Sequence, residues 1–242
     1  MTPGIGTGLD QQQLDALAAR ALDFVRPGAT VGLGSGRAAS AFVRALGARV
    51  GQGLRVRGVA TSEATARLAR GLDIPLVGLD EGIVDLTVDG ADEVDPRLDL
   101  IKGYGGALVR ERIVAAASRR RVTLVGSEKL VPVLGSLGRL PVEVIPFASP
   151  LVMRELAQLG CRPALRTVGD LPFVTDNGNW VLDCGVRPIE APAEFARDLR
   201  AIPGVVDTGL FLGLTDLVLV SEAGSVRELT RERRARERDG RR

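Results

Sequence analysis

Short apolar runs with strand character alternate with amphipathic helical segments over the first half of the chain. Apolar residues recur at helical spacing over residues 9–25, 38–46, 62–70 and 107–118. The strand-like runs cover residues 30–34, 54–60, 74–79, 84–90 and 121–126. Strands that alternate with helices in this way build a mostly parallel sheet with helices on both faces. We therefore predict a Rossmann-like α/β domain, with ligands at the carboxyl ends of its strands.

The pattern changes after about residue 137. Strand-like runs at 140–147, 205–212 and 216–222 surround a helical segment near 150–159, a hairpin at 173–183 and a helix over 193–202. The hairpin contains Asn177-Gly178, a dipeptide that a type I′ turn prefers. We predict a smaller α+β antiparallel domain over 137–210. The Rossmann-like domain then comprises 1–136 and 211–230, with the buried strand 216–222 returning to the first sheet.

Charge and apolar content restrict the location of the protein and the partners that it can bind. No apolar run approaches the roughly 18 residues that a membrane span needs, and the start of the chain lacks the pattern of a signal peptide, so we expect a cytoplasmic protein with no membrane partner. Residues 227–242 hold eight arginines against four acidic residues, which leaves the rest of the chain slightly acidic. Such a mixed-charge end is typical of a frayed helix or a disordered tail, here over 231–242. We expect no nucleic-acid partner.

The residue types that the chain lacks restrict its chemistry. It has no histidine, so proton transfer falls to carboxylates, lysine, tyrosine or cysteine, and serine-histidine hydrolases are excluded. Among 32 basic residues only Lys102 and Lys129 are lysines, and an ammonium differs from a guanidinium in what it can reach and polarise. We single out both lysines as candidates. Cys161 and Cys184 are too few for a disulfide framework or thiolate site, and are expected to be small core residues.

A glycine-rich loop lies between the first strand and the following helix, where backbone amides and the helix dipole favour anions. A dinucleotide fingerprint needs glycine at the position of Arg37, and a P-loop needs a lysine that is not there. The prediction is a cradle for a small phosphate, and the alternative is a tight turn without a ligand. The groups expected in the cradle are the Ser35 hydroxyl, the amides of Gly36, Arg37 and Ala38, and the Arg37 guanidinium.

An acidic loop follows the predicted strand at 84–90. Asp89 and Asp92, separated by Gly90 and Ala91, lie three residues apart at the carboxyl edge of the sheet. Two carboxylates so placed can hold a polyhydroxyl ligand or a hard cation, although a lysine arriving ten residues later argues against a metal. A third interpretation is that each aspartate only caps its own turn.

A lysine-glycine loop comes next in the chain. Glycines after Lys102, including Gly103 and Gly105, let the backbone approach a ligand closely. Tyr104, the only tyrosine, is either a lid over the ligand or an exposed loop residue. Glu111, in the next predicted helix between two arginines, by itself fits an ordinary surface ion pair.

Taken together, these residues resemble the ribose-5-phosphate isomerase type A family from about residue 10 to 225. The resemblance rests on VDGADEVDPRLDLIKGYGGALVRERIVA, SEKLV, LPVEVIPFA, TDNGNWVLD and AIPGVVDTGLF, in the family's order and spacing. It implies an aldose-ketose isomerase of the non-oxidative pentose phosphate pathway that interconverts D-ribose 5-phosphate and D-ribulose 5-phosphate through an enediolate. It also implies a homodimer or homotetramer, and the isomerisation requires neither a metal nor an organic cofactor.

The resemblance also implies roles for particular residues. Glu111 matches the proton acceptor, Asp89, Asp92 and Lys102 match groups around the sugar, and Lys129 matches a residue of the substrate site.

The chain departs from the family at Ser35 to Ala38, at Tyr104, and in the first helix, which lacks a common lysine. The departures leave open a divergent paralogue acting on another sugar phosphate, or a non-catalytic sugar-phosphate sensor. A dinucleotide-binding dehydrogenase is a more distant alternative that Arg37 disfavours.

Overall fold

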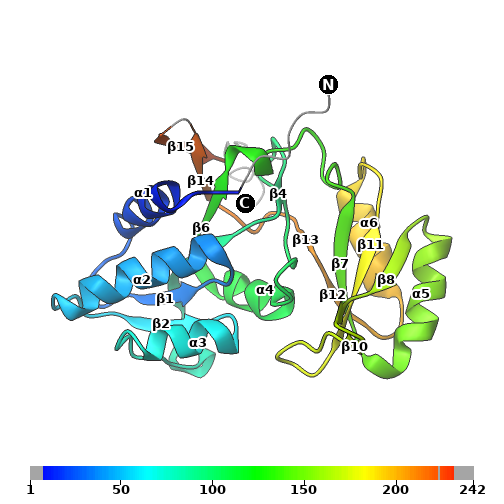
Figure 1. The fold of residues 1–242 in the computed structure, drawn as a ribbon, viewed down its shortest axis with the longest axis horizontal. Coiled ribbons are helices and arrows are strands. Elements are labelled where there is room, and N and C mark those ends of the chain that lie inside the picture. Colours follow the sequence, from blue (N-terminus) through cyan, green and yellow to red (C-terminus); the bar gives the residue numbers. More distant parts are fainter. Residues whose placement is uncertain (1–7, 223, 232–242) are drawn as a thin grey trace, which may run out of the picture.

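A six-stranded sheet forms the larger half of the molecule (Figure 1). The computed structural model describes residues 8–222 and 224–231. The strands lie in the order β15 (Ser225–Thr230), β14 (Leu217–Glu222), β6 (Ser118–Gly126), β3 (Val84–Gly90), β1 (Thr30–Leu33) and β2 (Arg57–Ala60). All neighbours pair in parallel except β14 and β15. The expected Rossmann-like class is confirmed, as is the return of the strand at 216–222 to this sheet.

Helices cover both faces of this large sheet (Figure 1). Helices α1 (Gln11–Leu22), α2 (Arg37–Gly51) and α3 (Glu63–Arg70) pack into the core on one face of the sheet, and α4 (Leu108–Ala116) packs on the other. Asp10 and Gln13 form a capping box that begins α1, and the Ser62 hydroxyl accepts a hydrogen bond from the Thr65 amide to begin α3. No helix of the described residues is long and apolar enough to cross a bilayer.

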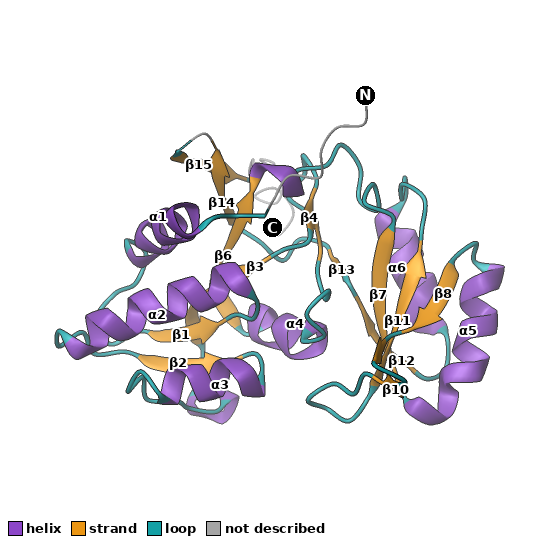
Figure 2. Cartoon of the chain, viewed as in Figure 1, coloured by secondary structure: helices purple, strands orange, loops and turns teal. Residues whose placement is uncertain are grey.

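A smaller antiparallel sheet lies beside the large one (Figure 2). Its strands lie in the order β12 (Val205–Thr208), β7 (Arg139–Val144), β11 (Trp180–Gly185) and β8 (Arg162–Leu165). Helices α5 (Ser149–Gln158) and α6 (Pro192–Ala201) pack on one face, over a core that includes both buried cysteines, Cys161 and Cys184. The opposite face of this sheet is turned toward the large sheet (Figure 2).

Short elements connect the two sheets. A three-stranded sheet is formed by β13 (Leu210–Phe211), β5 (Leu100–Ile101) and β4 (Glu93–Val94), and a small hairpin by β9 (Thr167–Val168) and β10 (Leu171–Pro172). Three 3-10 turns, η1 (Leu79–Glu81), η2 (Ser127–Lys129) and η3 (Pro146–Ala148), complete the described elements. Strand β5 ends just before Lys102, so this connecting sheet delivers the lysine to the edge of the large sheet.

Two local predictions are wrong. Residues 74–79 form no strand, because Pro75 lacks an amide hydrogen and Leu76 makes only one isolated bridge to Gly58. Residues 225–230, which the sequence analysis assigns to the Rossmann-like domain, pair with β14 as β15 and half-bury Val226 and Leu229. The remainder of the predicted tail, 232–242, lies outside the described residues.

The second wrong prediction concerns the turn in the hairpin at 173–183. Gly178 has a φ of +79°, but Asn177 is not among the residues with positive φ, and a type I′ turn needs both. The amide of Gly178 donates to the Thr175 carbonyl, and the Thr175 amide donates to the Asn179 carbonyl. The connection is therefore a three-residue loop that ends on a left-handed glycine.

Candidate functional site

A cleft of about 650 Å³ opens at the carboxyl ends of β1, β3 and β6. Strand β1 is followed by α2 and β3 by α4, and these helices lie on opposite faces of the sheet (Figure 1). The connections that leave β1 and β3 therefore run to opposite faces of the sheet, which opens a crevice between these two strands. In α/β sheets ligands bind at such a point. Most residues predicted from sequence line this cleft, namely Ser35, Gly36, Arg37, Ala38, Gly90, Ala91, Asp92, Lys102, Gly103, Gly105, Glu111 and Lys129.

The ammonium of Lys102 is buried between two carboxylates. Its Nζ lies 3.0 Å from Asp89 Oδ2 and 3.3 Å from Glu111 Oε2, and it donates to the Gly90 carbonyl at 2.5 Å. All three side chains are at most 10% exposed. Burial lowers the pKa of Lys102, but the charges of Asp89 and Glu111 outweigh it and raise that pKa above its usual value. The lysine is therefore a permanent cation in this site.

Glu111 lies in the first turn of α4, the helix that follows the lysine-glycine loop, and lines the cleft. Its Oε2 atom is buried and receives no properly directed hydrogen bond from the described residues. Burial first, and then the negative charge of Asp89, raise the pKa of Glu111 to about 8, against the opposing charge of Lys102. This carboxylate can therefore take up a proton near neutral pH.

The arginines on either side of Glu111 do not pair with it. Arg110 binds Glu63 and the hairpin loop at Asp176 and Asn177, while Arg112 pairs with Asp207. The alternative of a surface ion pair for Glu111 is therefore wrong. Helical periodicity explains it, because 110 and 112 lie on different faces of α4 from 111.

Asp89 lies behind Lys102 and does not line the cleft itself. Its Oδ1 accepts hydrogen bonds from the amides of Ser35, at 3.1 Å, and Gly90, at 2.7 Å. These bonds tie the loops after β1 and β3 together at close range. A Cβ at Gly34 would lie 2.3 Å from Asp89 Oδ1, so only glycine fits there.

Asp92 is half-buried and lines the cleft opposite the glycine loop. Its Oδ2 accepts a hydrogen bond from the Tyr104 amide at 2.9 Å. Burial raises the pKa of Asp92, although the Tyr104 amide and the charge of Lys102 oppose the rise. Within the described residues, no group of three or more cysteine, aspartate or glutamate side chains is arranged to hold a metal ion.

The glycine loop contributes an open helix N-terminus to the cleft. Gly36, the N-cap of α2, has a φ of +90° and open space where a Cβ would lie. The Arg37 guanidinium donates to the Leu9 carbonyl at 2.8 Å, and Lys129 lines the same cleft from η2. The Ser35 hydroxyl donates to the Ser62 hydroxyl at 2.8 Å, so its single proton is already engaged.

The ring of Tyr104 lies away from the cleft. It packs against the core of the small sheet, with its hydroxyl 3.3 Å from the Arg139 carbonyl and the Arg139 guanidinium 4.6 Å from the ring centroid. It is therefore neither the lid nor the exposed loop residue that the sequence analysis considered. Tyr104 contributes to the site through its backbone amide, which donates a hydrogen bond to Asp92.

Several cleft residues were not identified from the sequence, namely Gly8, Leu9, Leu124, Val125, Gly126, Glu128 and Leu137. Glu128 directly precedes Lys129 in the turn after β6, so the rule that ligands bind at strand carboxyl ends could have found it. Leu137 had no such signal. Its amide and that of Gly135 donate to the fully buried Glu93, a contact between segments more than 40 residues apart.

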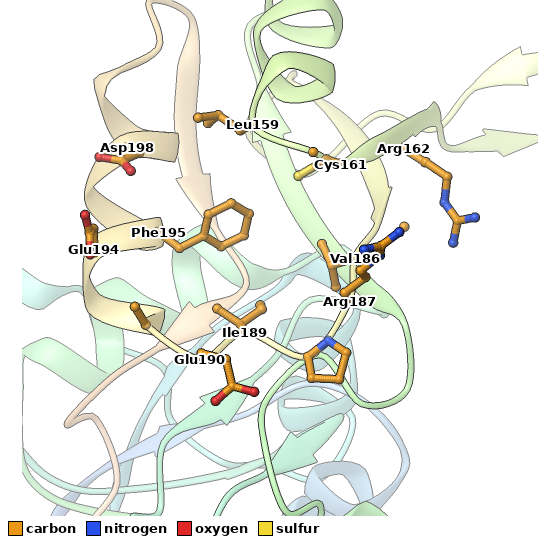
Figure 3. Close-up of a pocket in the computed structure, with 14 residues that line it drawn as sticks. Leu159, Cys161, Arg162, Val186, Arg187, Ile189, Glu190, Glu194, Phe195 and Asp198 are labelled. Carbon is orange, nitrogen blue, oxygen red and sulfur yellow. The ribbon is translucent and has the colours of Figure 1, made fainter.

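A second hollow, of about 790 Å³, lies on the small sheet between α6 and the strands β8 and β11 (Figure 3). Phe195 and Ile189 point into it, while Arg162, Arg187 and Glu190 surround it (Figure 3). These three charged side chains are exposed, in contrast to the buried cluster at Lys102. The groups suited to proton transfer therefore lie in the first cleft.

Comparisons with known proteins agree with this geometry. Residues 57–225 match the family model of ribose 5-phosphate isomerase A (phosphoriboisomerase A). The chain is 49% identical to ribose-5-phosphate isomerase A of Parvibaculum lavamentivorans over 216 residues, which cover 86% of this chain and 93% of that protein. Among solved structures, ribose 5-phosphate isomerase A of Methanocaldococcus jannaschii is similar, with a TM-score of 0.88, 38% identity and coverage of 92% and 100%.

A second solved structure, a D-ribose-5-phosphate isomerase in complex with phospho-erythronic acid, gives a TM-score of 0.88 at 36% identity. It covers 91% of this chain and 99% of its own. The match to the family model begins at residue 57, so it includes the acidic loop and the lysine-glycine loop of the cleft but not the glycine loop after β1. From this agreement of sequence, fold and cleft, the chain belongs to the ribose-5-phosphate isomerase A family.

Proposed function

We propose that this protein interconverts D-ribose 5-phosphate and D-ribulose 5-phosphate, with Glu111 carrying a proton between carbons 2 and 1 of the open-chain sugar. The observation that carries the proposal is the buried Oε2 of Glu111, which lies 3.3 Å from the Lys102 ammonium and has no other partner among the described residues. A base needs a free oxygen and a pKa near the working pH, and this carboxylate has both. Family membership supports the same reaction.

The remaining groups of the cluster act on the sugar oxygens. As Glu111 removes the proton, negative charge develops on the carbonyl oxygen, and Lys102 stabilises the resulting enediolate. One well-placed donor of this kind contributes about 3–4 kcal/mol to the transition state. Asp89 holds Lys102 in place and Asp92 accepts hydrogen bonds from the sugar hydroxyls, with one of the two assisting ring opening. The hydroxyl proton of oxygen 2 passes to oxygen 1 in the enediolate, and Glu111 returns its proton to carbon 1, which yields the ketose.

The phosphate of the substrate binds at the N-terminus of α2. The amides of Gly36 to Ala38 and the side chains of Arg37 and Lys129 supply positive potential at that end of the cleft. Ser35 shapes the loop through its hydroxyl partners. Binding energy gained at the phosphate positions carbons 1 and 2 against Glu111.

The proposal also covers the cofactor requirement, the location and the oligomeric state of the protein. Aldose and ketose have the same atoms and oxidation level overall, so the reaction requires no electron acceptor, and we propose that it proceeds without organic cofactor or metal. We also propose a cytoplasmic homodimer or homotetramer whose partner is a small sugar phosphate. We further propose that the chain divides at residues 137 and 211 into the Rossmann-like domain and the smaller α+β domain.

Solvent deuterium exchange tests the activity. We expect deuterium at carbon 2 of ribose 5-phosphate in D₂O, and ribulose 5-phosphate formation in a coupled assay with or without chelator. Other pentose and hexose phosphates serve as controls for specificity. A sugar-phosphate sensor would bind the substrate without exchange, and a divergent paralogue would prefer another sugar; neither alternative has support from the relatives described above. Binding without exchange would refute the proposal.

The acidic limb of the pH profile reports on Glu111. Because its pKa is raised to about 8, the base becomes protonated as the pH falls through that value. We expect kcat/KM to decrease below about pH 8, approaching tenfold per pH unit. The measurement is kcat/KM between pH 5 and pH 9 at constant ionic strength. Lys102 stays charged over this whole pH range, because its pKa is raised above the usual value. A limb near the ordinary glutamate value would contradict the assignment.

A further inference from the structure

The small sheet holds the lysine-glycine loop of the cleft through one buried arginine. We infer that Arg166 is a positioning residue for the isomerisation, which orients the backbone of residues 103–105 toward the substrate. This inference rests on the proposed function, and it assigns a role to a residue 55 positions beyond Glu111 in the chain.

Arg166 contacts the loop carbonyls directly. Its Nη1 donates to the carbonyls of Gly103 and Tyr104, each at 3.1 Å. The remaining nitrogens are fixed by Asp183, since Nε donates to Oδ2 at 2.9 Å and Nη2 to Oδ1 at 2.5 Å. The side chain is only 10% exposed. A two-pronged carboxylate contact of this kind leaves the guanidinium little freedom to move.

Asp183 is itself held from both sides. Arg139 donates to its two oxygens at 2.9 and 2.7 Å, and the same guanidinium lies over the Tyr104 ring. Burial raises the pKa of Asp183, but the hydrogen bonds from Arg166 and Arg139 outweigh it and lower that pKa. The aspartate thus remains an anion, and one carboxylate anchors both arginines that contact the loop.

The contacts fix the orientation of two peptide planes. The plane between Gly103 and Tyr104 is bound at its carbonyl by Arg166 and at its amide by Asp92, 2.9 Å away. In the next plane the Tyr104 carbonyl is bound by Arg166, so the amide of Gly105 points the opposite way, as in any trans peptide. Gly105 lines the cleft, and its amide has no hydrogen-bond partner among the described residues.

Orienting this amide matters because the enediolate places negative charge near Lys102, two residues before Tyr104. A backbone donor aimed at that charge stabilises the transition state only if the donor is already in position. Glycines at 103 and 105 give the loop many alternative conformations, and the two Arg166 hydrogen bonds restrict them, together with the hydrogen bond that the Gly106 amide donates to the Gly103 carbonyl at 3.0 Å. Arg166 therefore acts through the loop, and it contributes no atom to the cleft lining.

The test compares steady-state kinetics of Arg166→Ala and Arg166→Lys with a matched control. We expect Arg166→Ala to lower kcat by about 30-fold to 100-fold with KM changed less than about threefold, since small displacements of catalytic groups have effects of this size. Arg166→Lys keeps the charge but cannot reach two carbonyls and a carboxylate together, so we expect it to restore only part of kcat. The acidic limb assigned to Glu111 should stay in place in both variants.

The control is Arg57→Ala. Arg57 also bridges two elements, donating to Glu81 and Thr30 at 3.1 Å each, but it lies at the amino ends of the strands, away from the cleft. We expect its kcat to stay within about twofold of the unchanged protein. A kcat for Arg166→Ala as close to the unchanged protein as that of Arg57→Ala would overturn the inference, and if Arg166→Ala does not fold, Arg166→Lys decides by the same criterion. Absence of isomerisation in the unchanged protein would instead refute the proposed function.

Discussion

Glu111→Gln is expected to lower kcat by at least about a hundredfold while sugar-phosphate binding changes only a few-fold. The amide has nearly the shape of the carboxylate but cannot accept the proton from carbon 2. The side chain is buried beside Lys102, and Asp89, the other carboxylate on that ammonium, does not line the cleft and so cannot replace Glu111 against the substrate. The measurements are kcat from the coupled assay, deuterium exchange at carbon 2, and binding of ribose 5-phosphate by calorimetry.

The matched control for this variant is Glu194→Gln. Glu194, like Glu111, is a glutamate in the first turn of a helix, but it is exposed on α6. The same substitution there removes one negative charge and one helix-dipole contact, worth less than about 1 kcal/mol, without touching the cleft. Turnover by Glu111→Gln that matches Glu194→Gln would remove Glu111 from the mechanism.

Lys102→Met is expected to lower kcat by about a hundredfold to a thousandfold, the effect of losing one preorganised donor to the oxyanion. Methionine fills a similar volume but leaves Asp89 and Glu111 without the cation between them. Their repulsion then raises the pKa of Glu111 further, because Lys102 is the group that opposes the rise. The acidic limb of the residual activity should therefore move to higher pH, which a kcat/KM profile of the variant measures.

A second substitution separates charge from geometry at this position. Lys102→Arg keeps the positive charge, yet a planar guanidinium cannot reproduce the compact contacts with Asp89, Glu111 and the Gly90 carbonyl in a buried site. We expect it to recover less than about a tenth of the lost activity. Activity of Lys102→Met within tenfold of the unchanged protein, with an unmoved acidic limb, would show that Lys102 does not stabilise the enediolate.

Much of the large sheet could be predicted from local pattern. The run 84–90 is β3 to the residue, and Ser62 begins α3 as a cap, since apolar periodicity and capping side chains act within a few residues. The run 74–79 failed because Pro75 has no amide hydrogen to donate, so the segment makes only one isolated bridge, from Leu76 to Gly58 of β2. The turn at Asn177 failed because tertiary contacts of the loop, including the Asn177 hydrogen bond to Arg110, compete with the intrinsic preference of the dipeptide.

The site shows the same division between local and distant information. Lys102 was singled out by composition alone, and Asp89 and Asp92 by their place after a strand. Glu111 by itself fitted a surface ion pair, because sequence does not show which face of a helix is buried against a loop. Arg166 and Leu137 gave no signal at all, since each is placed by contacts with segments more than 40 residues away.

The sequence by itself determined the alternation of strands and helices, the helix caps, the glycine loop after β1, the acidic loop and the lysine-glycine loop. Each of these depends on side chains that are close together along the chain. Only the tertiary structure decided that Glu111 is buried with a free oxygen, that Lys102 lies between two carboxylates and that the small sheet holds the lysine-glycine loop. The physical reason is that a pKa and an oriented peptide plane depend on burial and on distant charges, which exist only once the two sheets have packed together.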